Sequence, residues 1–377
     1  MDFSYSEEQQ MLQDSVQKFV HNQYDFETRK EILKTEKGFS DANWQTFAEL
    51  GWLTVPFAEA DGGFGGSAVD LMVVMEEFGR GLVVEPFVPT TILGGGLVAA
   101  LGNEEQKGRL LPQIMEGKLQ LACAYAESTS RYNLASVSTQ ASKQGADYVL
   151  DGSKIVVLNG PAADKLLVVA RTSGEITAAE GISIFLVDAQ AQGIHKRNYR
   201  TVDGHQAAEI RFDKVSLPAS SLLGEEGKAL AALEQVVDRA TLALCAEAVG
   251  ELEMLLRKTV EYSKTRKQFG TAIGTFQALQ HRMADMFIEC QLAKSIVIMA
   301  AMKLDSSASD QEKARAVSAA KSRVGRAMRK VGQESVQLHG GIAITDELDV
   351  GHYFKRVTTI EHLFGNTDFH TQRFARS

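Results

Sequence analysis

Residues 212–244, FDKVSLPASSLLGEEGKALAALEQVVDRATLAL, decide the fold because the hydrophobic pattern changes within them. Up to Pro218, the stretch continues a series of short runs rich in Val, Ile and Leu, a pattern that is typical of strands. After the turn residues Gly224 and Gly227, apolar residues recur at helical spacing. The sequence therefore predicts that a β domain ends here and that a helical domain begins.

The strand-type runs extend back to about Leu119. Four more runs, at 119–127, 147–160, 165–172 and 181–188, are separated by Gly, Asp, Asn and Ser turns. None is long enough for a typical helix. The sequence therefore predicts an all-β barrel or sandwich of roughly a hundred residues.

Helical periodicity marks the first third of the chain. Ser6 and Gln9 form a capping-box pair, Ser40 or Asp41 begins a second helix, and Ser67 begins a third. A further helical pattern covers 92–101, and 102–118 is interpreted as a short helix pair. The glycine-rich run 62–66 lacks the lysine of a phosphate-binding loop and a preceding strand, so it is interpreted as a loop.

Three long amphipathic stretches follow the β domain, at 229–266, 277–304 and 310–338. Long helices with short connections indicate an antiparallel four-helix bundle. The predicted fold is mainly α with a central β domain. Its parts are an N-terminal helical domain (1–118), a central β domain (119–224) and a C-terminal helical bundle (225–377).

Composition excludes several classes of function. The chain has 377 residues and a formal net charge of -8, which argues against nucleic acid as the main partner. Cys123, Cys245 and Cys290 form no CxxC pair, so neither a metal site nor a disulfide framework is predicted. The N-terminus does not resemble a signal peptide and no run is long enough to span a membrane, so we expect a cytoplasmic protein.

Two polar motifs in the C-terminal part have chemistry suited to a nucleotide. Arg266 offers a planar cationic fork to a diphosphate, Phe269 can pack on an aromatic base, and Gln277 can bond polar edges. Gly340 and Gly341 leave room for close approach of a ligand to the backbone. Taken alone, the residues favour an interpretation as solvated helix residues and helix-ending glycines.

Four segments in order resemble the acyl-CoA dehydrogenase family: 102–118, 212–229, 263–286 and 336–347. The resemblance covers nearly the whole chain and implies FAD as cofactor, an acyl-CoA substrate and an electron-transfer flavoprotein as acceptor. It also implies fatty acid or lipid degradation and an oligomer built as a dimer of dimers. The residues that it implies for FAD binding are Arg266, Phe269, Gln277, Gln337, Gly340, Gly341 and Thr367, with the adenine-half set reaching the neighbouring subunit's cofactor.

The catalytic carboxylate that the resemblance implies is missing. The segment that usually reads Tyr-Glu-Gly-Thr is Phe364-Gly365-Asn366-Thr367, so Gly365 stands at the position of the base. The alternative base position, on the first helix of the C-terminal part, holds Ala240. The family arginine next to it is replaced by Thr241. Glycine and alanine cannot abstract a proton.

Two segments that the resemblance places against the flavin ring also differ. Residues 126–133, AESTSRYN, replace T-E-P-x-x-G-S-D, so Ala126 stands where a threonine is usual. Residues 156–160, VVLNG, replace W-I-T-N-G. The adenine-half residues match the family, whereas both ring segments and both base positions do not.

In the family, one subunit donates adenine-half residues to the FAD site of its neighbour. A chain that keeps only these residues suits a partner subunit that supplies the flavin-ring contacts and the base. The sequence resembles the small-subunit type of paired acyl-CoA dehydrogenases, such as that of pimeloyl-CoA dehydrogenase. Two alternatives stay open: a homo-oligomer with Asp238, a predicted substrate-binding residue, as a relocated base, and a flavin-free structural partner. Glu361 is expected to form an ordinary salt bridge, and His370 is expected to be structural.

Overall fold

The computed structural model describes residues 5–376, and the chain forms two compact units. One unit, which we call the helical unit, contains Met1–Glu31, Ser67–Val83 and Thr241–Ser377. The other, which we call the sheet unit, contains Ile32–Gly66 and Val84–Ala240. Each unit is described by itself. The division into three domains at 118/119 and 224/225 stays a prediction.

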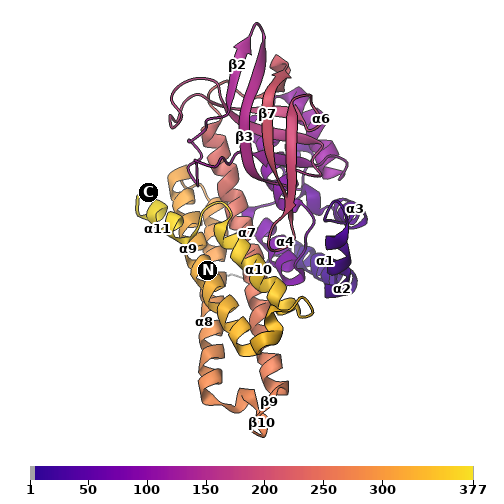
Figure 1. Ribbon diagram of the computed structural model, residues 1–377, viewed down its shortest axis with the longest axis vertical. Coiled ribbons are helices and arrows are strands. Elements are labelled where there is room, and N and C mark those ends of the chain that lie inside the picture. Colours follow the sequence, from indigo (N-terminus) through magenta and orange to yellow (C-terminus); the bar gives the residue numbers. More distant parts are fainter. Residues whose placement is uncertain (1–4, 377) are drawn as a thin grey trace. The chain divides into compact units, whose positions relative to one another are not determined.

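The helical unit is built on long helices from the C-terminal part of the chain (Figure 1). Its helices are α1 (Glu7–Gln23), the first part of α2 (Phe26–Lys34), α4 (Ala68–Gly81), most of α7 (Leu230–Thr265), α8 (Gln277–Leu304), α9 (Asp310–His339), α10 (Asp349–His362) and α11 (Thr367–Arg376). A small antiparallel hairpin, β9 (Lys267–Gln268) with β10 (Thr271–Ala272), joins α7 to α8.

Local signals position the ends of these helices, and the three long helices predicted from periodicity are confirmed. The Ser6–Gln9 capping box begins α1, and Ser67 with Asp70 forms another at α4. A third box, Ser309 with Glu312, begins α9. The sequence prediction missed α2, α10 and α11.

Helices α4 and α7 cross in backbone contact. A Cβ atom on Gly79 of α4 would overlap the carbonyl oxygen of Glu247, and a Cβ on Gly250 of α7 would overlap that of Glu76. Glycine at both positions is what lets two segments so far apart in the sequence approach this closely. One turn from the crossing, Arg80 of α4 pairs with Glu253 of α7 at 2.5 Å.

The sheet unit contains, within residues 5–376, an eight-stranded sheet in the order β6-β7-β3-β2-β4-β5-β8, with β1 parallel to β4. Its strands are β1 (Leu121–Ala124), β2 (Gln140–Gln144), β3 (Asp147–Leu158), β4 (Lys165–Arg171), β5 (Ile182–Asp188), β6 (Ile194–Arg200), β7 (Gln206–Leu217) and β8 (Leu222–Leu223). Tyr148, Phe185 and Phe212 lie in one buried cluster. The sequence prediction missed β2, β6 and β8.

The helices of the sheet unit precede the sheet in sequence. Ser40 caps α3 (Asp41–Glu49) as predicted. The helical pattern predicted at 92–101 begins earlier, as the π-helix η3 (Phe87–Gly95), and continues as α5 (Gly96–Leu101). The predicted helix pair at 102–118 is wrong. One helix, α6 (Glu104–Met115), continues through Pro112 because its apolar face is buried and Glu116 N still bonds the Pro112 carbonyl at 2.9 Å.

The order of helical, β and helical segments predicted from the sequence is confirmed. All three cysteines are free and buried, as expected for small core residues. None of the helices between residues 5 and 376 combines the length and the apolar character that a membrane crossing requires.

The α4–α7 crossing predicts a large effect of one methyl group. We expect Gly250→Ala to lower the free energy of unfolding by about 3 kcal/mol, because the helices must separate to admit the Cβ atom. Chemical denaturation followed by circular dichroism measures the change. The control is Gly108→Ala, since Gly108 lies within α6 and its Cβ would meet nothing within 4 Å. That substitution is expected to stabilise by about 0.5–1 kcal/mol, and equal losses in both variants would contradict the role of the crossing.

Candidate functional site

The residues predicted for the adenine half of the cofactor lie at one end of the helical unit. Arg266 directly follows α7, Phe269 lies in the turn between β9 and β10, and Gln277 begins α8. The end of α9 returns to the same place, because Tyr262 of α7 stacks on His339 with ring centroids 4.5 Å apart. An ion pair of 2.5 Å between Arg282 of α8 and Glu334 of α9 joins the remaining two helices there.

This set of residues is open. Phe269 is 93% exposed. Within residues 5–376, the side chains of Arg266, Gln277 and Gln337 have no hydrogen-bond or ion-pair partner. Their polar groups are therefore available to a ligand from outside the chain.

Glycine occurs at positions 340 and 341 of this cluster for different physical reasons. Gly340 has φ 70° and ψ -151°, a conformation that is essentially restricted to glycine. Gly341 has no such constraint, and a Cβ atom there would meet nothing within 4 Å. The surface beside it can thus admit the close approach of a ligand. An exposed aromatic ring, a guanidinium fork and bare backbone fit the adenine and diphosphate of a dinucleotide.

Gly365 lies between α10 and α11 in a conformation that a side chain would strain. Its φ is 114°, and a Cβ atom would lie 2.5 Å from Phe369 Cδ1 and 2.6 Å from His370 Nε2. The preceding Phe364 also has a left-handed φ of 57°. The position at which the resemblance implies a glutamate is therefore built for glycine.

Two buried basic side chains hold this loop by its carbonyl groups. Lys321 of α9 donates to the carbonyls of Ile360 and of Leu363, the latter at 2.8 Å. Burial lowers its pKa to about 8. His370 contacts the Phe364 carbonyl through Nε2 at 3.0 Å, and burial lowers its pKa to about 3, so it is neutral and structural, as predicted. No motif in the sequence pointed to Lys321.

Glu361 is directed at Thr367. Its Oε1 accepts hydrogen bonds from the Thr367 amide at 3.1 Å and from the Thr367 hydroxyl at 2.8 Å. The salt bridge predicted for Glu361 is present, with Arg329 at 3.6 Å. Glycine at 325 of α9 leaves the room for this contact, because a Cβ there would overlap both side chains. The hydroxyl proton of Thr367 is therefore used within the chain, and only the oxygen stays available as an acceptor.

The two groups of candidate residues lie at separate places on α9. Gly325 contacts the Glu361–Thr367 pair, and Gln337 belongs to the adenine-half cluster. Twelve residues of helix separate them, which is about 18 Å at 1.5 Å per residue. The chain does not bring its base loop and its adenine-half cluster together.

The two segments that the resemblance places against the flavin ring, 126–133 and 156–160, lie in the sheet unit, and a buried ion pair joins the first of them to Lys154, just before the second. Lys154 Nζ lies 2.7 Å from Glu127 Oε1, and the two side chains are 0% and 4% exposed. Glu127 also accepts from the Ser138 and Thr139 amides. Although burial alone would raise it, Lys154 brings the pKa of Glu127 down to about 2, while burial lowers the pKa of Lys154. The Ala126 carbonyl accepts at 2.9 Å from the amide of Ile155, the residue just before the second segment.

Val156 has φ 50°, in the left-handed region, and is 38% exposed. This conformation is unusual for a β-branched residue and costs of order 1–3 kcal/mol. It occurs at a register shift between Lys154 and Val157. Asn159, three residues on, is buried and donates to Gln120 Oε1 at 3.1 Å, which makes it an anchor of this segment. The bulge thus keeps its shape although the aromatic residue implied by the resemblance is absent.

The remaining predicted positions lie on α7. Asp238 is half-buried, and Ala240 and Thr241 are fully buried. Between them, Arg239 donates to the Gly66 carbonyl at 3.3 Å. In residues 5–376, no group of three or more His, Cys, Asp or Glu side chains is arranged to hold a metal ion.

Comparison with known proteins gives consistent matches along the chain. Models of the acyl-CoA dehydrogenase N-terminal, middle and C-terminal domains match residues 6–118, 122–215 and 230–377. The acyl-CoA dehydrogenase FadE12 of Mycobacterium tuberculosis is 31% identical over 351 residues, 92% of this chain and 90% of that protein.

Two solved structures have the same fold over nearly their full length. A chain from the structure of the electron transferring flavoprotein of Acidaminococcus fermentans has a TM-score of 0.90 and 28% identity, covering 100% of this chain and 99% of its own. A chain of the ChsE4-ChsE5 complex from Mycobacterium tuberculosis has a TM-score of 0.89 and 26% identity, covering 100% and 98%.

The buried Glu127–Lys154 pair predicts a stability change that depends on pH. We expect Lys154→Met to destabilise the protein by about 3–5 kcal/mol at pH 7, because it leaves a buried carboxylate without its cation. The folded pKa of Glu127 lies below its ordinary value of 4.5, so its contribution is complete above pH 4.5 and is lost towards pH 2. The difference between variant and wild type should therefore shrink below pH 4.5. Urea denaturation at several pH values measures it.

The control for that experiment is an exposed ion pair on the same sheet. Arg197 of β6 and Glu209 of β7 lie 2.6 Å apart with 75% and 41% of their side chains exposed. Arg197→Met should leave stability nearly unchanged, because solvent screens the charges of an exposed pair. Losses of similar size in the two variants would rule out a special role for the buried pair.

Gly365 predicts that the missing base cannot be restored by one substitution. We expect Gly365→Ala to destabilise the cofactor-free protein by about 2 kcal/mol or more, because the left-handed backbone and the contacts with Phe369 and His370 both oppose a Cβ atom. Gly365→Glu should lose at least as much and gain no desaturation activity. Gly341→Ala is the control, expected to change stability by less than about 0.5 kcal/mol. A Gly365→Ala variant as stable as the control, by thermal unfolding, would refute this prediction.

Proposed function

The chain belongs to the acyl-CoA dehydrogenase family, and on that premise we propose that it is the base-less subunit of a hetero-oligomeric, FAD-dependent enzyme that desaturates an acyl-CoA thioester. The family resemblance predicted from the sequence is confirmed, as are its oxidoreductase class and FAD as cofactor. The subunit role, the substrate and the site residues are the proposal.

The adenine-half cluster is the part of the chain that fits FAD best. Arg266 would bind a diphosphate oxygen, Phe269 would pack on the adenine, and Gln277 and Gln337 would bond polar edges. Gly340 and Gly341 would let the backbone approach the cofactor. Thr367 would accept a hydrogen bond with the oxygen that Glu361 leaves available. Bound FAD supplies a hydride acceptor, which no amino-acid side chain provides.

The observation that carries the proposal is the pair of base positions. Desaturation requires a group that takes the α-proton of the thioester. Gly365 has no room for a side chain, and Ala240 is a buried alanine. The adenine-half cluster is nevertheless complete and open, and it lies about 18 Å from the base loop along α9. Such a chain is suited to completing the FAD site of a partner that carries its own base.

Exposed apolar surface on the helical unit supports association with another subunit. Large apolar side chains that are 38–53% exposed follow α8 at Phe287, Ile288, Leu292, Met299 and Met302. Contiguous exposed apolar patches mark interaction sites. A solved relative, the ChsE4-ChsE5 complex, contains two different chains. A dimer of dimers is the proposed assembly.

The proposed reaction places this protein in the degradation of fatty acids or related lipids. Asp238 would contact the acyl-CoA substrate from the first half of α7. Electrons would leave through an electron-transfer flavoprotein, in keeping with the relative found in the structure of such a protein.

The first test is the flavin-to-chain ratio of the chain expressed alone and together with a base-bearing homologue. Alone, we expect almost no bound flavin, because segments 126–133 and 156–160 differ from those that the resemblance places against the flavin ring, and no bleaching by acyl-CoA, because neither copy supplies a base. Together, we expect one FAD per base-bearing site and acyl-CoA-dependent bleaching. In the complex, Arg266→Gln should weaken the affinity for FAD at least tenfold. Lys264→Gln should leave the affinity for FAD unchanged, because Lys264 pairs with the exposed Glu261.

Full flavin content and bleaching by the chain alone would overturn the subunit proposal. Asp238→Asn then becomes informative, because loss of bleaching with flavin still bound would identify Asp238 as a relocated base. A complex that gains neither flavin nor activity would contradict the proposal in a second way. If the homologue then binds its own FAD more tightly in the presence of this chain, the result would support a flavin-free structural role for this chain.

A further inference from the structure

The turn between α10 and α11 is held by a side chain of α9. Helix α10 ends at His362 and α11 begins at Thr367, so residues 363–366 make the turn. Two of them, Phe364 and Gly365, have left-handed φ values of 57° and 114°. Because the turn is so short, its direction depends on where the last carbonyl groups of α10 are held.

Lys321 holds the end of α10. The last carbonyl groups of a helix lack regular partners within it. Lys321 donates to those of Ile360 and Leu363, the latter at 2.8 Å, and its side chain is fully buried. A cation at the carboxyl end of a helix also interacts favourably with the helix dipole. Helix α9 thus supplies a cap to α10.

The direction of its donors explains lysine at this position better than its charge does. Burial lowers the pKa of Lys321 to about 8, while Cys245 and Glu361 raise it and Arg356 lowers it further. The ammonium is therefore still the main form at pH 7. A pKa below the ordinary value means that the folded state disfavours the charge. What lysine supplies here is a set of donors aimed at two carbonyl groups.

The same part of α9 receives the pair of side chains that orients Thr367. Gly325 lies about one turn after Lys321, and a Cβ atom there would overlap both Thr367 and Glu361. In the sequence, Glu361 lies between the two carbonyl groups that Lys321 holds, and it accepts from the Thr367 hydroxyl at 2.8 Å. A shift of the end of α10 would move Glu361, and the Thr367 oxygen with it.

We propose that Lys321 is a positioning residue of the cofactor site, which acts through the end of α10 and Glu361 to direct the Thr367 oxygen at FAD. The inference rests on the proposed function, which assigns Thr367 to FAD. Because Lys321 is fully buried and bonds backbone carbonyls, it acts without touching the cofactor. Lys321→Met keeps the length of the side chain and removes its donors, so it should release the turn and leave every cofactor contact in the sequence.

The first measurement is amide hydrogen exchange in the cofactor-free chain at pH 7, resolved by residue with NMR spectroscopy. The Thr367 amide donates to Glu361 at 3.1 Å, so its exchange reports whether this pair is in place. Lys321→Met should speed exchange of the Thr367 amide about tenfold, because the loosened turn breaks that hydrogen bond more often.

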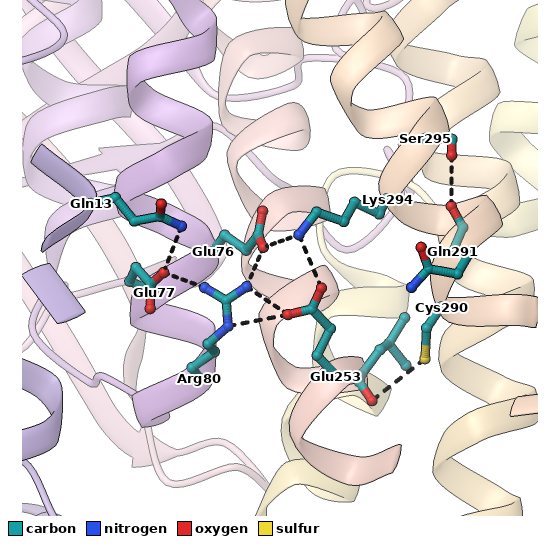
Figure 2. A network of polar contacts seen from close by, with 10 residues as sticks. Gln13, Glu76, Glu77, Arg80, Glu253, Cys290, Gln291, Lys294 and Ser295 are labelled. Atoms are coloured by element: carbon teal, nitrogen blue, oxygen red, sulfur yellow. Dashed lines mark hydrogen bonds and ion pairs between the residues drawn. The ribbon is translucent and has the colours of Figure 1, made fainter. Parts of the chain in front are cut away.

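Lys294→Met is the matched control. Lys294 of α8 belongs to the ion network around Arg80 and also holds two partners, Glu76 at 2.8 Å and Glu253 at 3.1 Å (Figure 2). These partners lie on α4 and α7, so the substitution removes a lysine with two contacts from the same unit but not from the turn. It should leave exchange at Thr367 unchanged.

The second measurement is FAD affinity in the complex with a base-bearing homologue. Lys321→Met and Thr367→Val should each weaken it about tenfold. The double variant should lose no more than Thr367→Val alone, because both substitutions act on one contact. The visible absorption band of bound FAD should shift equally in the two single variants and stay in place in Lys294→Met. A general loss of stability does not shift this band.

Unchanged exchange at Thr367 in Lys321→Met, or an equal increase in Lys294→Met, would overturn the inference. Additive losses of FAD affinity in the double variant would also overturn it, since Lys321 would then not act through Thr367. A wild-type complex without FAD would overturn the proposed function instead. The exchange measured in the cofactor-free chain would then still decide whether Lys321 positions the turn.

Discussion

The helical unit depends on the contact of two helix backbones at Gly79 and Gly250. Close packing in a protein interior leaves no room for even one methyl group at such a crossing. Helix α4 comes from the first third of the chain and α7 from the last part, so this contact closes the unit across a long separation in sequence. The ion network around Arg80 lies one turn away. Its directional contacts help to fix how α4 and α7 are placed against each other, which the two glycines alone would not determine.

Sequence patterns predicted the elements whose ends are marked by local chemistry. The capping box of Ser309 with Glu312 and the apolar stripe after it are sufficient to begin α9. The missed elements depend on partners elsewhere. Strand β6 reads IHKRNYR and shows no alternating apolar residues, because its pairing with β7 rather than burial keeps it extended. Helix α11 is polar, and its first residue, Thr367, is fixed by Glu361. Such contacts with distant residues produce no helical or strand periodicity in the sequence.

In the candidate site, too, the sequence predicted some features and missed those that depend on contacts with distant residues. The family resemblance located Gly365, but it did not show that φ 114° and the ring of His370 exclude any side chain there. It drew attention to Thr367 as a flavin contact, whereas the structure shows the hydroxyl donating to Glu361. Lys321, which holds two carbonyls of the same loop, belongs to no motif. A residue that acts through backbone carbonyls has no sequence signature, because any neighbouring residue offers the same carbonyl.

The adenine-half cluster and the base loop differ in what the fold requires of them. Gly365, Glu361 and Lys321 contact each other's segments, so packing within the helical unit restricts their exchange. The side chains of Arg266, Gln277 and Gln337 form no hydrogen bond or ion pair within the described chain, and Phe269 is 93% exposed. An exposed aromatic ring lowers solubility, and the ring contact of Phe269 with Phe276, at 6.2 Å between centroids, leaves most of its surface open to solvent. Packing within the chain does not account for these four side chains, and their chemistry suits the nucleotide ligand proposed for them.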